Sequence, residues 1–370
     1  MLIFIFFFLI LLLIVLGSHL LIGLFIIKFF LITGGFYKNL VYAGLSALAL
    51  SFVASVIIIH WWQGPVLKIA YGLSSIWLGL ALNLILASII GWLIILVSRL
   101  AGWNLNHIWA SALLLAFALS FSIYGIWNAN QIKVKTINIG IPNLPKTWVG
   151  RTAVQISDTH LGAINGAAFF KKIVALAKKE NPDVIFITGD LFDGSSKDFK
   201  NLIEPLKELR TPMGMYFITG NHEVYSGLGK VEAALSLIPV RTLNDEVINI
   251  EGVQIAGIYY PSENIGTKKD VQPILEKIDK SKPSIVLYHE PVPGIVEKIK
   301  KAGVNLLLTG HTHRGQIFPA NFFSWLIYRD YFYGVYKDGP FTLYTTSGAG
   351  TWGPPMRNTG APEIVKIIFR

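Results

Sequence analysis

The sequence has no cysteine among its 370 residues, and it has no aspartate or glutamate before residue 158. The first absence excludes disulfide bonds and thiolate metal ligands. The second leaves Lys28, Lys38, Lys68 and Arg99 as the only charged side chains in residues 1–130. About a quarter of the residues in a typical soluble domain are charged, so this first third of the chain has the composition of a membrane-embedded segment.

Four long apolar runs lie in this first part of the chain. They cover residues 2–27, 40–59, 69–97 and 108–127. Each is long enough to cross the hydrocarbon core of a bilayer, which takes roughly 20 residues of helix. A cleaved signal peptide is a poor alternative for the first run, because no basic residue precedes it and three more runs follow. We therefore predict a transmembrane region of four helices over residues 1–128.

The loop charges bear on the orientation of this multi-pass integral membrane protein. Three basic residues lie in the first and third loops, and only Lys68 lies in the second. The positive-inside rule then favours a cytoplasmic first and third loop, with residues 129–370 on the extracytoplasmic side. Three lysines between residues 133 and 146 favour the opposite orientation.

From residue 132 on, strand-length apolar runs alternate with helix-like stretches. Strands are expected at residues 153–156, 184–188, 215–218, 254–258, 284–288 and 306–308. Helices are expected at residues 169–179, 199–209, 229–237, 271–278 and 292–301. This alternation predicts an α/β domain over residues 129–370, with a largely buried β-sheet core flanked by helices. Two last strands, near residues 341–345 and 364–369, are expected to complete the sheet.

Polar clusters follow five of these predicted strands. They are Ser157-Asp158-Thr159-His160, Gly189-Asp190-Leu191-Phe192-Asp193, Gly220-Asn221-His222-Glu223, His289-Glu290-Pro291 and Gly310-His311-Thr312-His313. Loops at the carboxyl ends of strands converge on the ligand crevice of an α/β sheet. One such residue is more often a helix cap, but all five histidines after residue 128 fall in these clusters. Nitrogen and oxygen donors without sulfur predict Mn, Fe, Zn or Co, and the donors exceed the needs of one ion.

The ordered motifs D-x-H, G-D-x-x-D, G-N-H-E, H and G-H-T-H resemble the calcineurin-like metallophosphoesterase family over residues 154–347. The tail at residues 347–357 resembles the membrane-associated branch of that family. The resemblance implies two divalent metal ions bridged by Asp190. It assigns the first ion to Asp158, His160, Asp190 and His313, and the second to Asp190, Asn221, His289 and His311.

The resemblance also implies roles for residues beside the ligands. His222 is expected to stabilise the transition state or to protonate the leaving alkoxide, with Glu223 or a nearby acid fixing its tautomer. Capping of the next helix is the alternative for His222. Asp193 is expected to orient a histidine or a loop.

Two arginines are candidate substrate contacts. Arg314 follows the last motif and Arg357 lies in the Gly/Pro-rich tail. A guanidinium matches the geometry of a phosphate group, but Arg314 could equally pair with a surface carboxylate.

A run of aromatic and apolar residues follows the last metal motif. It comprises Phe318, Phe322, Phe323, Trp325, Leu326, Tyr328, Tyr331, Phe332 and Tyr333. Core packing is one interpretation. The other is that part of the run enters the membrane interface or holds an acyl chain.

These observations predict a membrane-anchored dinuclear-metal phosphoesterase that hydrolyses a phosphate ester or anhydride through a metal-activated hydroxide. The expected partners are membrane lipids and a phosphorylated small-molecule or lipid substrate. Residues 129–370 carry 28 basic and 22 acidic residues, an excess of six without long basic runs, so we expect no nucleic acid partner. The alternatives are a nuclease-type phosphodiesterase and a catalytically silent metal-binding membrane module.

Overall fold

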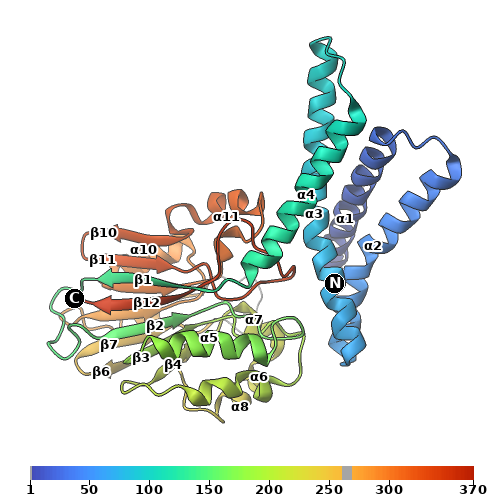
Figure 1. Ribbon diagram of the computed structural model, residues 1–370. Coiled ribbons are helices and arrows are strands. Elements are labelled where there is room, and N and C mark those ends of the chain that lie inside the picture. The colour runs from blue at the N-terminus through green and yellow to red at the C-terminus, as the bar shows by residue number, and fades with distance from the viewer. Residues whose placement is uncertain (1, 261–268) are drawn as a thin grey trace. The chain divides into compact units, whose positions relative to one another are not determined.

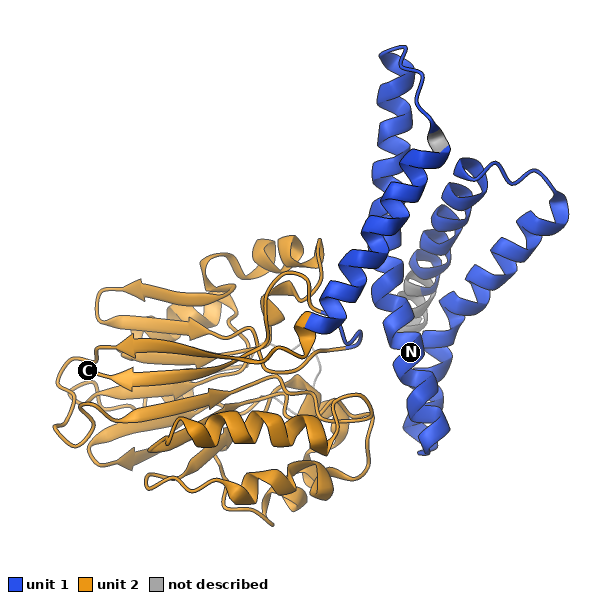
Figure 2. Cartoon of the chain, in the orientation of Figure 1, with its two compact units in different colours: residues 1–127, 353–356 blue, residues 128–352, 357–370 orange. Residues whose placement is uncertain are grey.

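The computed structural model describes residues 2–260 and 269–370. The chain forms two compact units (Figure 2). The first comprises the residues up to 127 together with residues 353–356, and the second comprises residues 128–352 and 357–370. The short segment Gly353–Met356 therefore interrupts the second unit and belongs to the first.

Among the described residues, four long helices make up most of the first unit (Figure 1). They are α1 (Leu2–Phe29), α2 (Gly35–Trp61), α3 (Pro65–Leu100) and α4 (His107–Ala129). All four are long and apolar enough to cross a membrane. They extend the predicted spans by a few residues at most ends. Pro65 starts α3, at a position where the missing N–H of proline has no intrahelical partner to lose.

Close contacts and buried polar groups hold α1 and α3 together. A side chain at Gly91 of α3 would meet Phe25 of α1 at 2.5 Å, so glycine lets the two helices approach closely. His19 of α1 is buried. Its Nε2 accepts a hydrogen bond from Nε1–H of Trp77 at 3.0 Å, and its Nδ1 lies 2.8 Å from the carbonyl oxygen of Val15.

The strands described in the second unit form two six-stranded sheets, where the sequence predicted one. The first sheet has the order β1 (Lys133–Ile139), β12 (Glu363–Phe369), β2 (Thr152–Ile156), β3 (Val184–Thr188), β4 (Met215–Ile218), β5 (Arg241–Thr242). The second has the order β10 (Gly334–Asp338), β11 (Phe341–Thr345), β9 (Leu306–Thr309), β8 (Ser284–Leu287), β7 (Val253–Gly257), β6 (Glu246–Ile250).

The two sheets pack face to face between two outer layers of helices. One side carries α5 (Ala167–Lys179), α6 (Phe199–Ile203), the 3-10 helix η1 (Glu204–Glu208) and α8 (Leu228–Leu235), as Figure 1 shows. The other side carries α9 (Gln272–Leu275) and α10 (Pro293–Lys301). Successive residues of β3 alternate between layers: Val184 and Phe186 pack between the sheets, whereas Ile185 and Ile187 pack under the helices. Burial on both faces explains its uninterrupted apolar sequence.

Several elements differ from the prediction. The helix expected over residues 199–209 is divided at Glu204, because Pro205 cannot continue an α-helix and the chain tightens into η1. Strands β5, β6 and β10 and helix α11 (Ala320–Tyr328) were not predicted. Three of the five residues of β10 are exposed and the other two are partly buried, so it lacks the apolar signal of the inner strands.

The direction of the strands decides where the site forms. β2, β3 and β4 run parallel to one another, and so do β7, β8, β9 and β11. The predicted polar clusters therefore leave both sheets at the same end of the domain. The helix α7 (Asn221–Ser226) and the 3-10 helices η2 (His313–Gly315) and η3 (Arg329–Tyr331) follow in these loops, and Figure 1 shows α7 and α11 at this end.

Candidate metal centre

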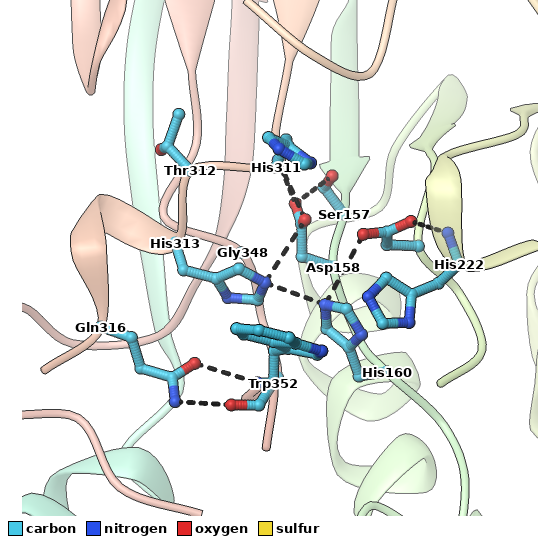
Figure 3. A network of polar contacts seen from close by, with 12 residues as sticks. Ser157, Asp158, His160, His222, His311, Thr312, His313, Gln316, Gly348 and Trp352 are labelled. Atoms are coloured by element: carbon cyan, nitrogen blue, oxygen red, sulfur yellow. Dashed lines mark hydrogen bonds and ion pairs between the residues drawn. The ribbon is translucent and has the colours of Figure 1, made fainter. Parts of the chain in front are cut away.

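Three buried side chains form a first donor set at the carboxyl ends of β2 and β9. Asp158, His160 and His313 each offer one atom, and these atoms all lie within 4.8 Å of one another. His160 Nε2 lies 2.8 Å from His313 Nε2, and His313 Nε2 lies 3.6 Å from Asp158 Oδ1 (Figure 3). Nitrogen and oxygen atoms able to ligate a metal ion are thus gathered at one point.

A second donor set lies directly beside the first and comprises Asp190, His289, His311 and Asn221. His289 Nε2 lies 3.1 Å from Asp190 Oδ2 and 3.3 Å from His311 Nδ1. His311 Nδ1 in turn lies 3.0 Å from the Asn221 side-chain oxygen. All seven residues assigned as ligands from the sequence are thus brought together, although they are spread over residues 158–313.

Asp190 lies close to histidines of both sets. Its Oδ2 lies 3.1 Å from His289 Nε2 in the second set and 3.8 Å from His160 Nε2 in the first. Its Oδ1 accepts a hydrogen bond from the backbone N–H of His222 at 2.9 Å. Because that bond orients the carboxylate, Oδ2 is left between the two groups of imidazole nitrogens.

Contacts behind the histidines fix which ring nitrogen faces the centre. Nδ1 of His289 donates to the carbonyl oxygen of Thr188 at 2.8 Å, so Nε2 is the nitrogen that can give up its proton to bind a cation. Nε2 of His311 lies 3.7 Å from a carboxylate oxygen of Glu290, so its Nδ1 faces the other donors. Partners of this kind hold histidine ligands in one tautomer and orientation in metalloproteins.

The backbone at the centre is strained. Five of the seven predicted ligands have left-handed backbone with φ between 46° and 68°: Asp158, His160, Asp190, His311 and His313. Such a conformation costs a non-glycine residue on the order of 1–2 kcal/mol. Folded proteins keep strain of this kind where a site requires it, and here it turns the side chains that follow the strands towards one another.

Two motif glycines make room for the carboxylates. A side chain at Gly220 would collide with Asp190 Oδ1 and would come within 2.8 Å of His289 Nε2. A side chain at Gly310 would collide with Asp158 Oδ2. The glycines of the G-N-H-E and G-H-T-H motifs are therefore required by space.

The charges of the centre are strongly perturbed. Burial raises the pKa of Asp158 to about 6. Burial alone would also raise the pKa of Asp190, but the imidazoles of His289 and His222 hold that pKa well below its usual range. In return, and against the effect of burial, the Asp190 carboxylate raises the pKa of His289 to about 10. Without a metal, Asp190 and His289 thus form a buried ion pair, whose proton a divalent cation would replace.

His222 lies beside both sets at the start of α7. Its ring is 4.6 Å from that of His160, centroid to centroid, and its Nδ1 is buried with no hydrogen-bond partner among the described residues. It also offers a donor within 4.8 Å of His160 and Asp190. Burial lowers its pKa, so the imidazole is neutral at pH 7. A buried polar atom without a partner is the feature expected where a ligand completes the site.

Glu223 has contacts that differ from the expectation that it orients His222. Its carboxylate accepts four hydrogen bonds, from the backbone N–H groups of Gly220, Asp190, Leu191 and Phe192, at 2.7–3.1 Å. Burial raises the pKa of Glu223 to about 7. The side chain therefore ties together the two loops that carry Asp190 and Asn221.

Arg357 is fully buried rather than open to a substrate. Its Nη2 lies 2.9 Å from Nδ1 of His313, and it donates to the carbonyl oxygens of Ser347 at 2.7 Å and Gly350 at 2.6 Å. Burial lowers its pKa to about 10, which still leaves it charged at pH 7. Arg357 thus supports a predicted metal ligand from behind.

The two remaining candidates from the sequence lie at the margin of the centre. Arg314 is half-buried, and its guanidinium lies over the ring of Tyr333, 4.4 Å from the centroid. Asp193 accepts hydrogen bonds from the backbone N–H and the hydroxyl group of Ser195 at 2.7 Å each, so it orders a loop, as expected.

The sequence did not single out several residues that shape the centre. Ser157 donates to Asp158, and Glu290 backs His311. Gln316 holds Trp352 by two backbone hydrogen bonds of 2.9 Å, and the Trp352 ring lies 6.3 Å from that of His222 (Figure 3). Ser157 and Glu290 adjoin motif residues and could have been found there, whereas Trp352 lies in a loop far away along the chain.

The fold and the centre together define a class: an α/β domain with a cluster of histidine and carboxylate candidate ligands, on a chain whose described residues include four membrane-capable helices. Residues 152–315 match the family described as calcineurin-like phosphoesterase. An uncharacterized metallophosphoesterase of Aquifex aeolicus is 31% identical over 253 residues, which cover 65% of this chain and 92% of the relative. The chain belongs to the calcineurin-like metallophosphoesterase family.

Two further relatives are longer than the matched region. An uncharacterized metallophosphoesterase of Helicobacter pylori is 32% identical over 64% of this chain and 63% of its own length. A transmembrane protein with metallophosphoesterase domain from Bos taurus is 32% identical over 67% of this chain and 60% of its own length. The chain thus spans less than two thirds of these relatives.

Proposed function

We propose that this protein is a membrane-anchored phosphohydrolase that uses two divalent cations to cleave a phosphate ester or anhydride. The observation that carries the proposal is the position of Asp190 Oδ2, within 4 Å of an imidazole nitrogen of each donor set. Neighbouring donor sets that share a carboxylate are the arrangement expected of two-metal hydrolases. The donors are nitrogen and oxygen only, which fits Mn, Fe, Zn or Co.

The residues divide between the two cations as follows. Asp158, His160 and His313 would hold the first, Asn221, His289 and His311 the second, and Asp190 both. When bound, the pair supplies a water of lowered pKa and positive charge at the phosphoryl oxygens. The chain keeps the donors fixed before binding, through the bonds from His289 to Thr188 and from His222 N–H to Asp190.

His222 is the proposed catalytic side chain. Its neutral imidazole lies next to both donor sets with a buried, unpaired Nδ1. An N–H there would donate to an oxygen of the phosphoryl group as negative charge develops. As the bond from phosphorus to the leaving oxygen breaks, that oxygen takes up a proton, and the same group is placed to give it.

The test is a hydrolysis screen of the purified full-length chain with Mn, over soluble phosphomonoesters, diesters, nucleotide pyrophosphates and phosphorylated lipids. Asp190→Asn is expected to lower kcat/KM by on the order of 1,000-fold, together with the metal content per chain. His222→Ala is expected to lower kcat by roughly 100-fold or more, with metal content unchanged. Wild-type activity in Asp190→Asn would refute the two-metal mechanism, and metal loss in His222→Ala would make His222 a ligand instead.

The proposed substrate class is a phosphorylated lipid or another phosphate compound held at the membrane. The membrane-capable helices described on the same chain support this choice, because they would hold the enzyme where a membrane-bound substrate is concentrated. In the screen, the substrate presented in vesicles should then be cleaved with a higher kcat/KM than its soluble headgroup. Equal values for the two would contradict the lipid assignment while leaving the hydrolase intact.

We also infer that the catalytic domain lies on the extracytoplasmic side. Lys28 and Lys38 flank the connection between α1 and α2, and Arg99 lies in the last turn of α3, whereas Lys68 alone marks the connection between α2 and α3. Positive residues favour cytoplasmic loops.

A further inference from the structure

We propose that the outer face of α11 contacts the lipid bilayer at the boundary between headgroups and acyl chains. The proposal concerns the helix that follows the last metal loop, and it stands whether or not the protein is a hydrolase. A membrane is the one partner that the chemistry and the position of α11 both fit.

The outer face of α11 is apolar and open. Exposed fractions are 52% for Phe322, 60% for Phe323, 44% for Trp325, 37% for Leu326 and 63% for Ile327. Consecutive side chains of this size are rarely exposed together on a soluble domain, and a patch of them marks an interaction site. The core-packing interpretation of the aromatic run therefore fails for Phe322, Phe323, Trp325 and Leu326, whereas it holds for the buried Tyr328 and Tyr331.

The charges near α11 also fit a membrane surface. No residue from Gly315 to Tyr328 is charged, whereas Arg314 precedes the stretch and Arg329 and Asp330 follow it. The exposed Arg329 lies at the carboxyl end of α11, with its guanidinium 5.7 Å from the ring centroid of Trp325. Tryptophan and arginine side by side are typical of helices at the headgroup level, where both have an apolar body and a polar end.

The inner face of α11 is fixed to the metal loops. A side chain at Gly315 would collide with the backbone of Asn321, so the helix packs directly on η2. Tyr328 is buried, and its hydroxyl donates to Glu290 at 2.9 Å. Glu290 is the carboxylate behind His311. The open apolar face is therefore presented by a rigidly held helix.

The place of α11 within the second unit makes a bilayer its natural partner. Asn128 stands at the end of the membrane-capable helix α4 and belongs to this unit. Its side chain donates to the carbonyl oxygens of Arg357 at 3.0 Å and Gly360 at 3.1 Å. In the same segment, Asn358 accepts from the backbone N–H of Phe318, which leads into α11. The point where the chain enters a membrane helix and the start of α11 are thus held by one short segment.

The test uses the absence of cysteine from the natural sequence. Phe323→Cys is labelled with an environment-sensitive fluorophore in the full-length chain, reconstituted in phosphatidylcholine/phosphatidylglycerol nanodiscs with and without brominated acyl chains. Leu237→Cys is the matched control, because Leu237 is an equally open apolar residue (50% exposed) outside α11. Ile327→Cys, one turn along the same face, repeats the measurement in case the first variant folds poorly.

The expected result is blue-shifted emission at positions 323 and 327 and loss of that fluorescence in brominated nanodiscs, with neither effect at position 237. Emission typical of water at both α11 positions would overturn the proposal. Blue-shifted emission without quenching would overturn it too, because it would mean that protein covers the face, either a second copy of the chain or its own helices.

Discussion

At the scale of single residues, the centre depends on side chains that position the candidate ligands and the loops that carry them. Asp190 divides its two oxygens between a backbone N–H and the neighbouring imidazoles. Glu223 and Arg357 are both buried and charged or chargeable, and both bond mainly to backbone groups of the loops that carry the predicted ligands. Burying such groups costs free energy unless every polar atom has a hydrogen-bond partner. Removing one of them should therefore destabilise all the loops to which it bonds.

Glu223→Ala tests this distinction between holding and catalysing. The substitution would leave four buried backbone N–H groups without acceptors, and we expect a loss of roughly 3 kcal/mol or more in the free energy of unfolding. Metal content should fall with it, because the loops carrying Asp190 and Asn221 would separate. Thermal unfolding and metal analysis of the purified chain would check both. A variant with normal stability and normal metal but a low kcat would instead support the catalytic role expected from the sequence.

At the scale of elements, short polar contacts set the register between neighbouring strands whose sequences are similarly apolar. Asp183 precedes β3 and accepts from the backbone N–H of Thr152, the first residue of β2, at 2.7 Å and from Arg151 at 2.6 Å. Burial by itself raises the pKa of Asp183, but these two donors outweigh it and the pKa is lowered. This contact places β2 and β3, and with them Asp158 and Asp190, at the same level.

Asp183→Asn should therefore destabilise the domain in a manner that depends on pH. The folded-state pKa is below the unfolded value near 3.9, so the stabilisation is present above about pH 4 and is lost as the pH falls through the folded-state pKa. We expect a loss of about 1 kcal/mol at pH 7, since the ion pair is partly exposed. Thermal unfolding of wild type and variant should show a smaller difference at pH 3 than at pH 7. An equal difference at both values would mean that the charge of Asp183 contributes nothing.

At the scale of the whole molecule, the chain passes between its two units at three places, after residues 127, 352 and 356. In the first unit, Met356 and Pro354 lie so close to α3 that a side chain at Gly79 would meet them at 2.9 Å and 3.1 Å. The Met356 sulfur accepts from Asn83 at 3.6 Å, and Asn83 also donates to Ser122 at 2.7 Å. Asn83 of α3 thus binds the segment Gly353–Met356, which lies between Trp352 and Arg357 in the sequence.

The proposed orientation is tested on the same scale. Leu237→Cys in intact cells should react with a membrane-impermeant maleimide if the catalytic domain lies outside the cytoplasm. Phe36→Cys, in the first turn of α2, should stay unlabelled until the cells are broken. The reverse pattern would place the domain in the cytoplasm and would make the three lysines that follow α4 the decisive charges.

The sequence by itself determined the long apolar helices, most inner strands and the loops that carry the seven candidate ligands. Each of these has a local signal: a run without charge, a run of buried apolar residues, or a polar motif directly after a strand. Within each sheet, the predicted ligands lie near one another because parallel strands end at one edge, as the order of elements predicts. The loop positions of Asp158, Asp190 and His311 are examples.

Only the tertiary structure decided that there are two sheets rather than one, that Glu223 and Arg357 face backbone groups, and that α11 leaves an apolar face open. The sequence does not show whether an apolar residue of α11 packs inward or faces outward. It also does not show whether an arginine is buried or exposed. These outcomes depend on which partners the fold brings near, over separations such as the 44 residues from His313 to Arg357. Local patterns carry no information about contacts at that range.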